Sequence, residues 1–230
     1  MRILGIETST AVCSVGLFVD GERGIEQSVR ESHIHSEKLL TLVQEVTHAG
    51  RIGLKQLDAI AISIGPGSFT GLRIGLSTAK GLSFALDKPL VALSTFEAIA
   101  EAARQKYQAS GSIVVLIDAK KEEWYMGRFH ALGAGVIASG PVAVKSLGDA
   151  LAVMKNEKPA LVLTDNVDEM RRALDIGATI EDVHGCCRGD VVAMLAHARV
   201  LNREFSDAAS LEPMYLKDFV VRTVASATKD

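Results

Sequence analysis

The chain has 230 residues, of which 48% are hydrophobic and 23% charged, and its formal net charge is −3. This composition is that of a globular protein with a sizeable core, and the weak negative charge disfavours a stand-alone nucleic-acid binder, which usually has a broad basic surface. No apolar run approaches the roughly 18–20 residues that span a bilayer, and Glu7 interrupts the N-terminal apolar run too early for a secretory signal. We therefore expect a cytoplasmic protein without a membrane partner.

The first half of the chain alternates strand and helix patterns. Short apolar runs bounded by turn residues predict strands at residues 2–7, 12–19, 24–30, 58–64 and 90–93. Apolar residues at helical spacing predict helices at residues 36–49, 69–86 and 95–108. The chain therefore opens with a β-meander, whose Asp20-Gly21 dipeptide is a strong hairpin signal.

The second half repeats this opening in a degenerate form. A buried-type strand at residues 113–118 ends in an acidic residue, as the first strand does, and a polar turn leads to a strand at residues 124–129. The further predicted elements are helices at 147–155, 167–174 and 190–202, a strand at 160–164 and an irregular tail from 206 to 230. We expect an α/β fold of mixed sheets flanked by helices, in two related lobes, residues 1–100 and 101–230.

Two polar segments near the N-terminus are candidate ligand sites. The turn Glu7-Thr8-Ser9 carries hydroxyls and backbone amides that can donate to a phosphate, and a carboxylate that can contact hydrated magnesium. A plain polar turn is the alternative. His33 and His35 would share one face of an extended segment, but without a carboxylate partner at fixed spacing a solvated strand end is favoured over a metal pair.

The three cysteines, Cys13, Cys186 and Cys187, are an odd number without C-x-x-C spacing, which predicts reduced, buried thiols rather than disulfides or a zinc site.

The segment GPGSFTGLRIG at residues 65–75 joins a predicted strand to a predicted helix. A helix N-terminus favours an anion, yet the segment matches neither a Walker A loop nor G-x-G-x-x-G, so it is a weak sign of nucleotide binding.

Small residues recur every four positions along this helix and share one of its faces: Gly71, Gly75, Ala79 and Ser83. Each Gly inside a helix costs up to about 1 kcal/mol relative to Ala, which indicates that another backbone approaches closely. The partner is a helix of the same chain or of another subunit. We favour a subunit interface, with Arg73 beside it for a bidentate contact with a carboxylate.

Three motifs in this order carry a family resemblance: GIETS at residues 5–9, GPGSFTGLRIG at 65–75 and PMYLK at 213–217. With them the whole chain resembles the bacterial TsaB (YeaZ) family. The resemblance implies an actin-like fold, as in sugar kinases and Hsp70, made of two duplicated lobes. It implies a role in making threonylcarbamoyladenosine in tRNA, as a homodimer when alone and as the activating partner of the catalytic paralogue TsaD. It also implies TsaE as the associated ATPase, and contact with tRNA only through the complex.

The resemblance also implies that the catalytic site of the paralogue is missing. Catalytic members carry a His-x-x-x-His metal pair where this chain has Thr95 and Ile99, and neither side chain is a useful metal ligand. We therefore expect no catalytic residues, no metal, no required cofactor and no glycoprotease-like activity. Lys217 stands where related sequences carry an Arg.

Two other function classes stay open. One is an actin-like ATPase or kinase that holds magnesium and ATP between the Glu7-Thr8-Ser9 turn and the turn after Asp118. The other is stand-alone tRNA binding, which the charge of −3 disfavours. The segment at residues 213–217 is expected to pack on the domain, with Tyr215 supplying a hydrogen-bonding tip.

Overall fold

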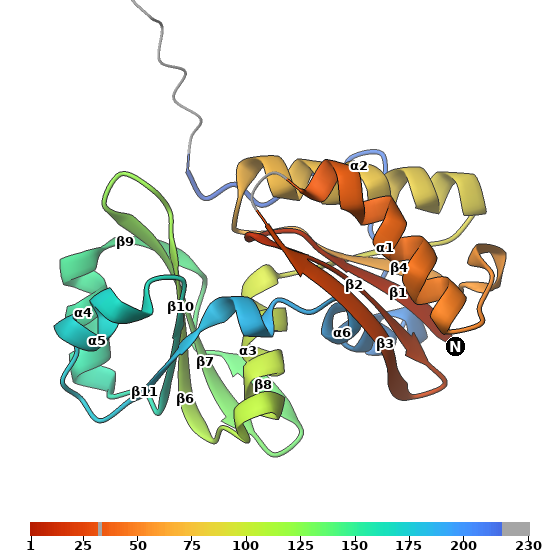
Figure 1. The fold of residues 1–230 in the computed structure, drawn as a ribbon. Coiled ribbons are helices and arrows are strands. Elements are labelled where there is room, and N and C mark those ends of the chain that lie inside the picture. The colour runs from red at the N-terminus through yellow and green to blue at the C-terminus, as the bar shows by residue number, and fades with distance from the viewer. Residues whose placement is uncertain (32–33, 218–230) are drawn as a thin grey trace, which may run out of the picture.

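The structure is a computed structural model that describes residues 1–31 and 34–217, and it consists of two lobes side by side (Figure 1). The first lobe is built on a five-stranded sheet in the order β3-β2-β1-β4-β5. Its strands are β1 (Arg2–Glu7), β2 (Val12–Val19), β3 (Glu22–Arg30), β4 (Ala59–Ser63) and β5 (Leu90–Leu93). β1 runs antiparallel to β2 and parallel to β4, and every strand predicted for this half is present.

The second lobe repeats this arrangement. Its sheet follows the order β11-β10-β6-β7-β8, with β9 also paired to β7, and β6 is again antiparallel to one neighbour and parallel to the other. The strands are β6 (Gly111–Asp118), β7 (Glu123–Leu132), β8 (Gly135–Ala138), β9 (Ala143–Ser146), β10 (Leu161–Thr164) and β11 (Thr179–Asp182). The shared order confirms the predicted duplication.

Three strands were not predicted, namely β8, β9 and β11. Each is four residues long, and their sequences GVIA, AVKS and TIED contain few or no alternating apolar residues. They form because a longer neighbour supplies the pairing: β8 and β9 both pair with β7, and β11 pairs with β10. A pattern within the segment itself is therefore too weak to reveal them.

Helices α1 (His35–Ala49) and α2 (Phe69–Leu86) cover one face of the first-lobe sheet. Helices α4 (Leu147–Glu157) and α5 (Val167–Ala173) cover one face of the second-lobe sheet. Short 3-10 helices occur at η1 (Leu54–Gln56) and η2 (Val183–Cys186). Some of the predicted helices begin at capping residues: Ser68 Oγ accepts from Gly71 N at the start of α2, and Ser146 Oγ caps α4. In contrast, α1 and α6 begin without a side-chain cap.

The remaining helices cross between the lobes. α3 (Thr95–Tyr107) packs its Phe96, Ile99 and Ala103 into the core of the second sheet. α6 (Gly189–Leu201) packs in the opposite direction, with Val192, Ala193 and Ala196 against strands of the first sheet (Figure 1). The division expected at residue 100 therefore differs from the structure, because a helix joins the sheet that buries its apolar side chains and not its nearest neighbour in sequence.

The start of α6 touches the first sheet backbone to backbone. A Cβ added at Gly5 would lie 2.0 Å from the Gly189 carbonyl oxygen, and one at Gly16 would lie 2.2 Å from the Asp190 nitrogen. The Ser14 hydroxyl accepts a hydrogen bond of 2.8 Å from Gly189 N at the same place. These glycines bring α6 against β1 and β2 more closely than any side chain permits.

Among residues 1–31 and 34–217, no helix has both the length and the apolar character that a membrane crossing requires.

Candidate functional site

The two lobes face each other across a cleft of about 720 Å³. The first lobe contributes residues 9–11, after β1, and the first turn of α2. The second lobe contributes residues 117–120 at the end of β6, together with Tyr125, Asp165 and His184. The cleft therefore brings together the ends of β1 and β6, which are equivalent strands of the two lobes, and both of these strands end in a carboxylate.

The Glu7-Thr8-Ser9 turn lies under this cleft with its polar groups turned inward. Glu7 and Thr8 are 0% exposed and Ser9 is 1% exposed. Ser9 donates to Glu7 Oε1 twice, from its nitrogen at 2.6 Å and from its hydroxyl at 2.5 Å, while Ser68 N donates to the Ser9 carbonyl at 2.7 Å. The amide and the hydroxyl of Ser9 are therefore used within the turn and do not donate into the cleft in this conformation.

Burial also sets the protonation of Glu7. Removal from water raises the pKa of its carboxyl above the ordinary 4.5, and the Ser63 and Ser9 hydroxyls only partly oppose this rise. Glu7 Oε2 and Ser63 Oγ are both buried without a hydrogen-bond partner among the described residues. They stand on adjacent strand ends, one residue beyond the Ile6–Ile62 pair. Because burial raises its pKa, Glu7 fits this site better as a neutral acid than as a carboxylate facing magnesium.

The small-residue face of α2 packs on this same turn. A Cβ at Gly71 would lie 2.1 Å from the Thr8 carbonyl oxygen, and one at Gly75 would lie 2.1 Å from Thr8 Oγ1. Ala79 is part of the first-lobe core. Ser83 is also buried, and its hydroxyl donates to the Lys88 carbonyl at 2.6 Å.

The subunit interface predicted at Gly71, Gly75, Ala79 and Ser83 is therefore wrong, because the approaching backbone belongs to the same chain. Leu72 and Leu76 are buried beside these residues, so the small and the large side chains together form one broad core face.

Arg73 is the exposed residue of the five assigned to that interface. Its guanidinium lies 3.9 Å from the centroid of the Phe69 ring, and its Nε donates to the Tyr215 hydroxyl at 2.8 Å. The expected carboxylate contact is thus replaced by a cation–π contact and a phenol hydrogen bond within the chain. The prediction that the PMYLK segment packs on the domain is confirmed.

The turn after β6 is the second-lobe wall of the cleft. Lys120 donates to Asp118 from its backbone nitrogen at 2.7 Å and from its side-chain Nζ at 2.6 Å. Burial raises the pKa of Asp118, but these hydrogen bonds and the Lys120 charge outweigh burial, so the pKa is lowered. The Asp118 backbone nitrogen donates in turn to both carboxylate oxygens of Asp165. Burial raises the pKa of the Asp165 carboxyl. The next residues, Lys120 to Glu122, have φ of 64°, 59° and 61°, a left-handed conformation that costs each about 1–2 kcal/mol.

Thr95 and Ile99, the two residues that the resemblance places where a metal pair is expected, have structural contacts. Thr95 Oγ1 accepts from Gly65 N at 3.0 Å, and Ile99 is fully buried in the second-lobe core. His35 is buried with Nε2 3.2 Å from the Val12 carbonyl, and His33 lies outside the described residues. Within the described ranges, no three His, Cys, Asp or Glu residues form a cluster that could hold a metal.

The cysteines are buried free thiols, as predicted. Desolvation, aided by Glu7, raises the pKa of Cys13 to about 12, and desolvation raises the pKa of Cys186 to about 11. Desolvation also raises the pKa of Cys187. These thiols therefore stay protonated near neutral pH and are poor nucleophiles.

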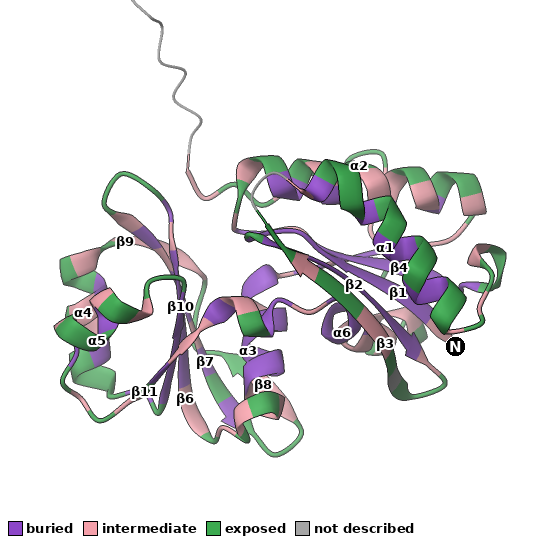
Figure 2. Ribbon diagram, in the orientation of Figure 1, coloured by how far each residue is buried: buried purple, intermediate pink, exposed green. Residues whose placement is uncertain are grey.

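One functional candidate was missed in the sequence, the outer face of α2. Ser77, Gly81 and Ala85 also recur every four residues, and all three are exposed, as is Phe84 at 92%. Figure 2 shows exposed residues at intervals along α2. Ser77 is two positions after Gly75, which places it about 200° around the helix. The sequence did contain a sign of this face, because Phe84 stands on the side of the helix that lies away from the core leucines Leu72 and Leu76.

Two duplicated lobes of this strand order around a cleft define the actin-like class of proteins. A ROK family glucokinase from Streptomyces griseus, solved with glucose and AMPPNP, shares the fold with a TM-score of 0.51 at 9% identity, covering 86% of this chain and 100% of that one. The family model TsaD, described as tRNA N6-adenosine threonylcarbamoyltransferase, matches residues 29–218. The chain belongs to this family, and its relatives assign it to the TsaB (YeaZ) group.

Two relatives illustrate the assignment. A Pseudomonas aeruginosa protein described as similar to peptidase YEAZ superposes with a TM-score of 0.82 at 25% identity, covering 94% of this chain and 99% of that one. The tRNA threonylcarbamoyladenosine biosynthesis protein TsaB of Haemophilus influenzae is 37% identical over 128 residues, covering 56% of this chain. That match spans 53% of the relative, so the aligned part of the chain corresponds to about half the length of this curated relative.

The burial of Glu7 predicts a pH-dependent stability. Because its folded pKa lies above its unfolded value, the native chain binds more protons, and the free energy of unfolding falls as pH rises from about 4.5 through the folded pKa. Glu7→Gln removes this dependence and adds a donor for Ser63. Its free energy of unfolding, measured by urea denaturation, should rise relative to wild type between pH 5 and pH 8. The exposed Glu45→Gln is the control, and parallel pH profiles for Glu7→Gln and wild type would contradict the assignment.

The packing of α2 predicts opposite effects for two substitutions in one helix. Gly71→Ala forces a methyl group against a backbone oxygen and should lower the free energy of unfolding by about 3 kcal/mol. Gly81→Ala meets nothing within 4 Å and should raise it by up to about 1 kcal/mol, since Ala favours the helix. Urea denaturation at low protein concentration measures both. A tolerated Gly71→Ala would reopen the original assignment of an interface.

Proposed function

We propose that this chain takes part in the biosynthesis of N6-threonylcarbamoyladenosine in tRNA, as a non-catalytic subunit that binds and activates a TsaD-type catalytic paralogue. The family membership and the names of its relatives support the pathway. Thr95 and Ile99, which stand in place of the metal pair, support the non-catalytic role, since one holds the Gly65 loop and the other fills the core. A TsaE-type ATPase completes the proposed complex, and tRNA is reached through it.

The observation that carries the proposal is the outer face of α2, which we call the docking face: Ser77, Gly81, Phe84 and Ala85. Phe84 exposes 92% of its surface, and a Cβ at Gly81 would have no neighbour within 4 Å. An exposed Phe and a helix-weakening Gly have no purpose within the chain, whereas together they fit a partner helix that approaches closely.

The same face also serves the proposed homodimer of the isolated chain. A two-fold axis beside α2 would place Phe84 of each copy against the small residues of the other, as a self-complementary interface requires. Leu40 of the neighbouring helix α1 is 57% exposed and extends the apolar surface of this layer. Homodimer and heterodimer then compete for one surface.

Substitutions on the docking face should weaken the partner complex without unfolding the chain. Phe84→Ala removes the aromatic anchor, and a loss of about 2 kcal/mol corresponds to a roughly 30-fold higher Kd for the TsaD-type subunit. Gly81→Leu should be at least as damaging because it holds the partner helix away. Titration calorimetry with the catalytic subunit of the same organism measures both. Leu132→Ala, an exposed apolar residue of the second lobe, is the matched control.

If both variants bind the catalytic subunit as wild type does, the docking face is misplaced, whereas failure of the wild-type chain to bind overturns the proposed role itself. The role is also tested by activity: modification of tRNA by the reconstituted system should depend on this chain and should be lost with Gly81→Leu.

We further propose that the isolated chain needs no nucleotide. The inward-facing donors of the Glu7 turn support this, since Ser9 gives both of its hydrogen bonds to Glu7. Titration of Mg·ATP into the isolated chain should produce no saturable heat. Saturable binding with turnover would favour the ATPase or kinase alternative, and salt-sensitive binding of tRNA by the chain alone would favour direct tRNA recognition.

A further inference from the structure

The last described residues of the chain connect the two lobes. After α6, the chain returns along the first lobe and ends beside the second (Figure 1). Met214 N donates to the Ile64 carbonyl at 2.7 Å, just after β4. A Cβ at Gly65 would lie 2.9 Å from the Met214 carbonyl oxygen, so the two segments are in close contact. We call residues 213–217 the strap.

The first anchor of the strap is Tyr215, on the first lobe. Its ring lies 5.2 Å from the Phe69 ring, measured between centroids, and its hydroxyl accepts the 2.8 Å hydrogen bond from Arg73 Nε. Arg73 covers the Phe69 ring at the same time. Phe69 also lines the interlobe cleft, so this anchor sits at the edge of the cleft.

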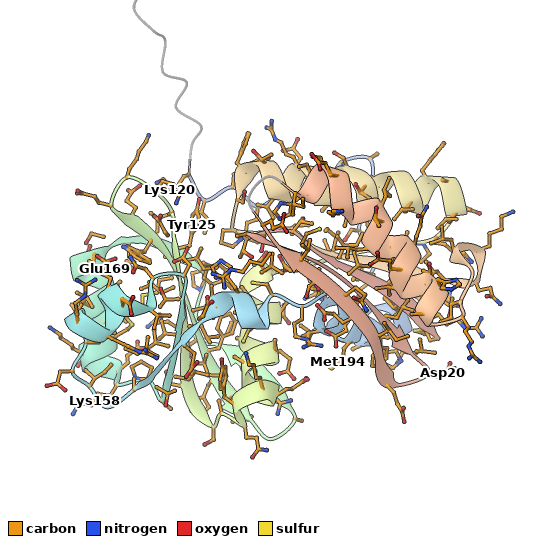
Figure 3. All side chains as sticks on the ribbon, in the orientation of Figure 1. Asp20, Lys120, Tyr125, Lys158, Glu169 and Met194 are labelled. Atoms are coloured by element: carbon orange, nitrogen blue, oxygen red, sulfur yellow. The ribbon has the colours of Figure 1, made fainter. Side chains whose placement is uncertain are left out.

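The second anchor is Lys217, on the second lobe. Its ammonium donates to the carbonyls of Ala119 at 2.8 Å and Lys120 at 3.1 Å, and pairs with Glu123 Oε2 at 2.5 Å. Only 22% of the Lys217 side chain is exposed. The Ala119 and Lys120 carbonyls belong to the turn between β6 and β7, which is left-handed at residues 120–122, and Glu123 begins β7. Asp118 and Lys120 line the cleft, and Figure 3 labels Lys120 on the second lobe, near Tyr125.

We propose that the strap is an interlobe clamp and that Lys217 is its latch. The two anchors hold opposite walls of the cleft, Phe69 on one side and the 119–120 carbonyls on the other, so opening the cleft requires one anchor to break. The latch also donates hydrogen bonds to two carbonyls of this turn, which holds its residues 120–122 in their left-handed form. The strap therefore sets both the width of the cleft and the shape of its second wall.

A second interlobe contact provides the comparison. Arg30 of β3 pairs with Asp182 at 2.6 Å, but the two side chains are 55% and 43% exposed. Such a solvated ion pair contributes little to holding two bodies together. The partly buried ammonium with three acceptors is the stronger constraint, because water replaces it less easily.

Lys217→Met tests the latch, since it keeps the length of the side chain and removes the donors. Spin labels at Glu45→Cys on α1 and Asn156→Cys on α4 report the interlobe distance, and the buried, protonated native cysteines do not compete for the label. We expect a longer and broader distance distribution in Lys217→Met, and amide exchange at residues 118–123 at least about tenfold faster. Lys217→Arg, which restores the donors, should recover both.

Arg30→Met is the matched control and should leave both measurements as in wild type. Tyr215→Ala weakens the other anchor but leaves the Met214 N–Ile64 O hydrogen bond, so it should open the cleft, to a smaller extent than Lys217→Met. The proposal is overturned if Lys217→Met keeps the wild-type distances and exchange, or if Arg30→Met opens the lobes equally. Neither measurement involves a partner protein, so its outcome is independent of the docking experiments.

Discussion

The fold depends on how closely other backbone segments approach the β1–β2 hairpin. On one face of the sheet, Gly5 and Gly16 admit the start of α6 to distances that exclude any Cβ. At the tip, Gly71 and Gly75 of α2 enclose Thr8 in the same way. These contacts fix where two helices from distant parts of the sequence lie. They also bury the acidic turn, so a single steric constraint determines the architecture of the first lobe and removes its most polar turn from solvent.

This constraint supports the proposal that the isolated chain needs no nucleotide. The end of β1 and the end of β6 are equivalent, yet Glu7 is fully buried while the Asp118 side chain is 34% exposed and paired with Lys120. The duplicated lobes therefore give the cleft two unlike walls. Both lobes line the cleft with polar residues, and the second lobe adds the charged side chains of Asp118, Lys120 and Asp165. The exposed Phe84 lies on the outer face of α2, which fits the proposal that the chain contributes through a partner.

The strap and the crossing helices α3 and α6 all connect the two lobes. α3 and α6 each leave one lobe to pack on the other, so the lobes are joined near the start of these helices. The strap adds a third connection at the edge of the cleft, through Tyr215 and Lys217. Because Arg73 belongs both to this connection and to the exposed side of α2, the cleft and the docking face share one helix.

The sequence by itself determined the strands and helices that have a strong pattern of their own, the duplication, the buried thiols and the family. It did not reveal β8, β9 and β11, which exist only through pairing with neighbours, nor the crossing of α6 to the first lobe. It showed that a backbone must approach α2 closely, but small residues recur every four positions on two faces about 200° apart. Only the tertiary structure decided that Gly71 and Gly75 face Thr8 of the same chain while Ser77 and Gly81 face outward. The reason is that periodicity defines a face, whereas what lies against that face depends on residues far away in the sequence.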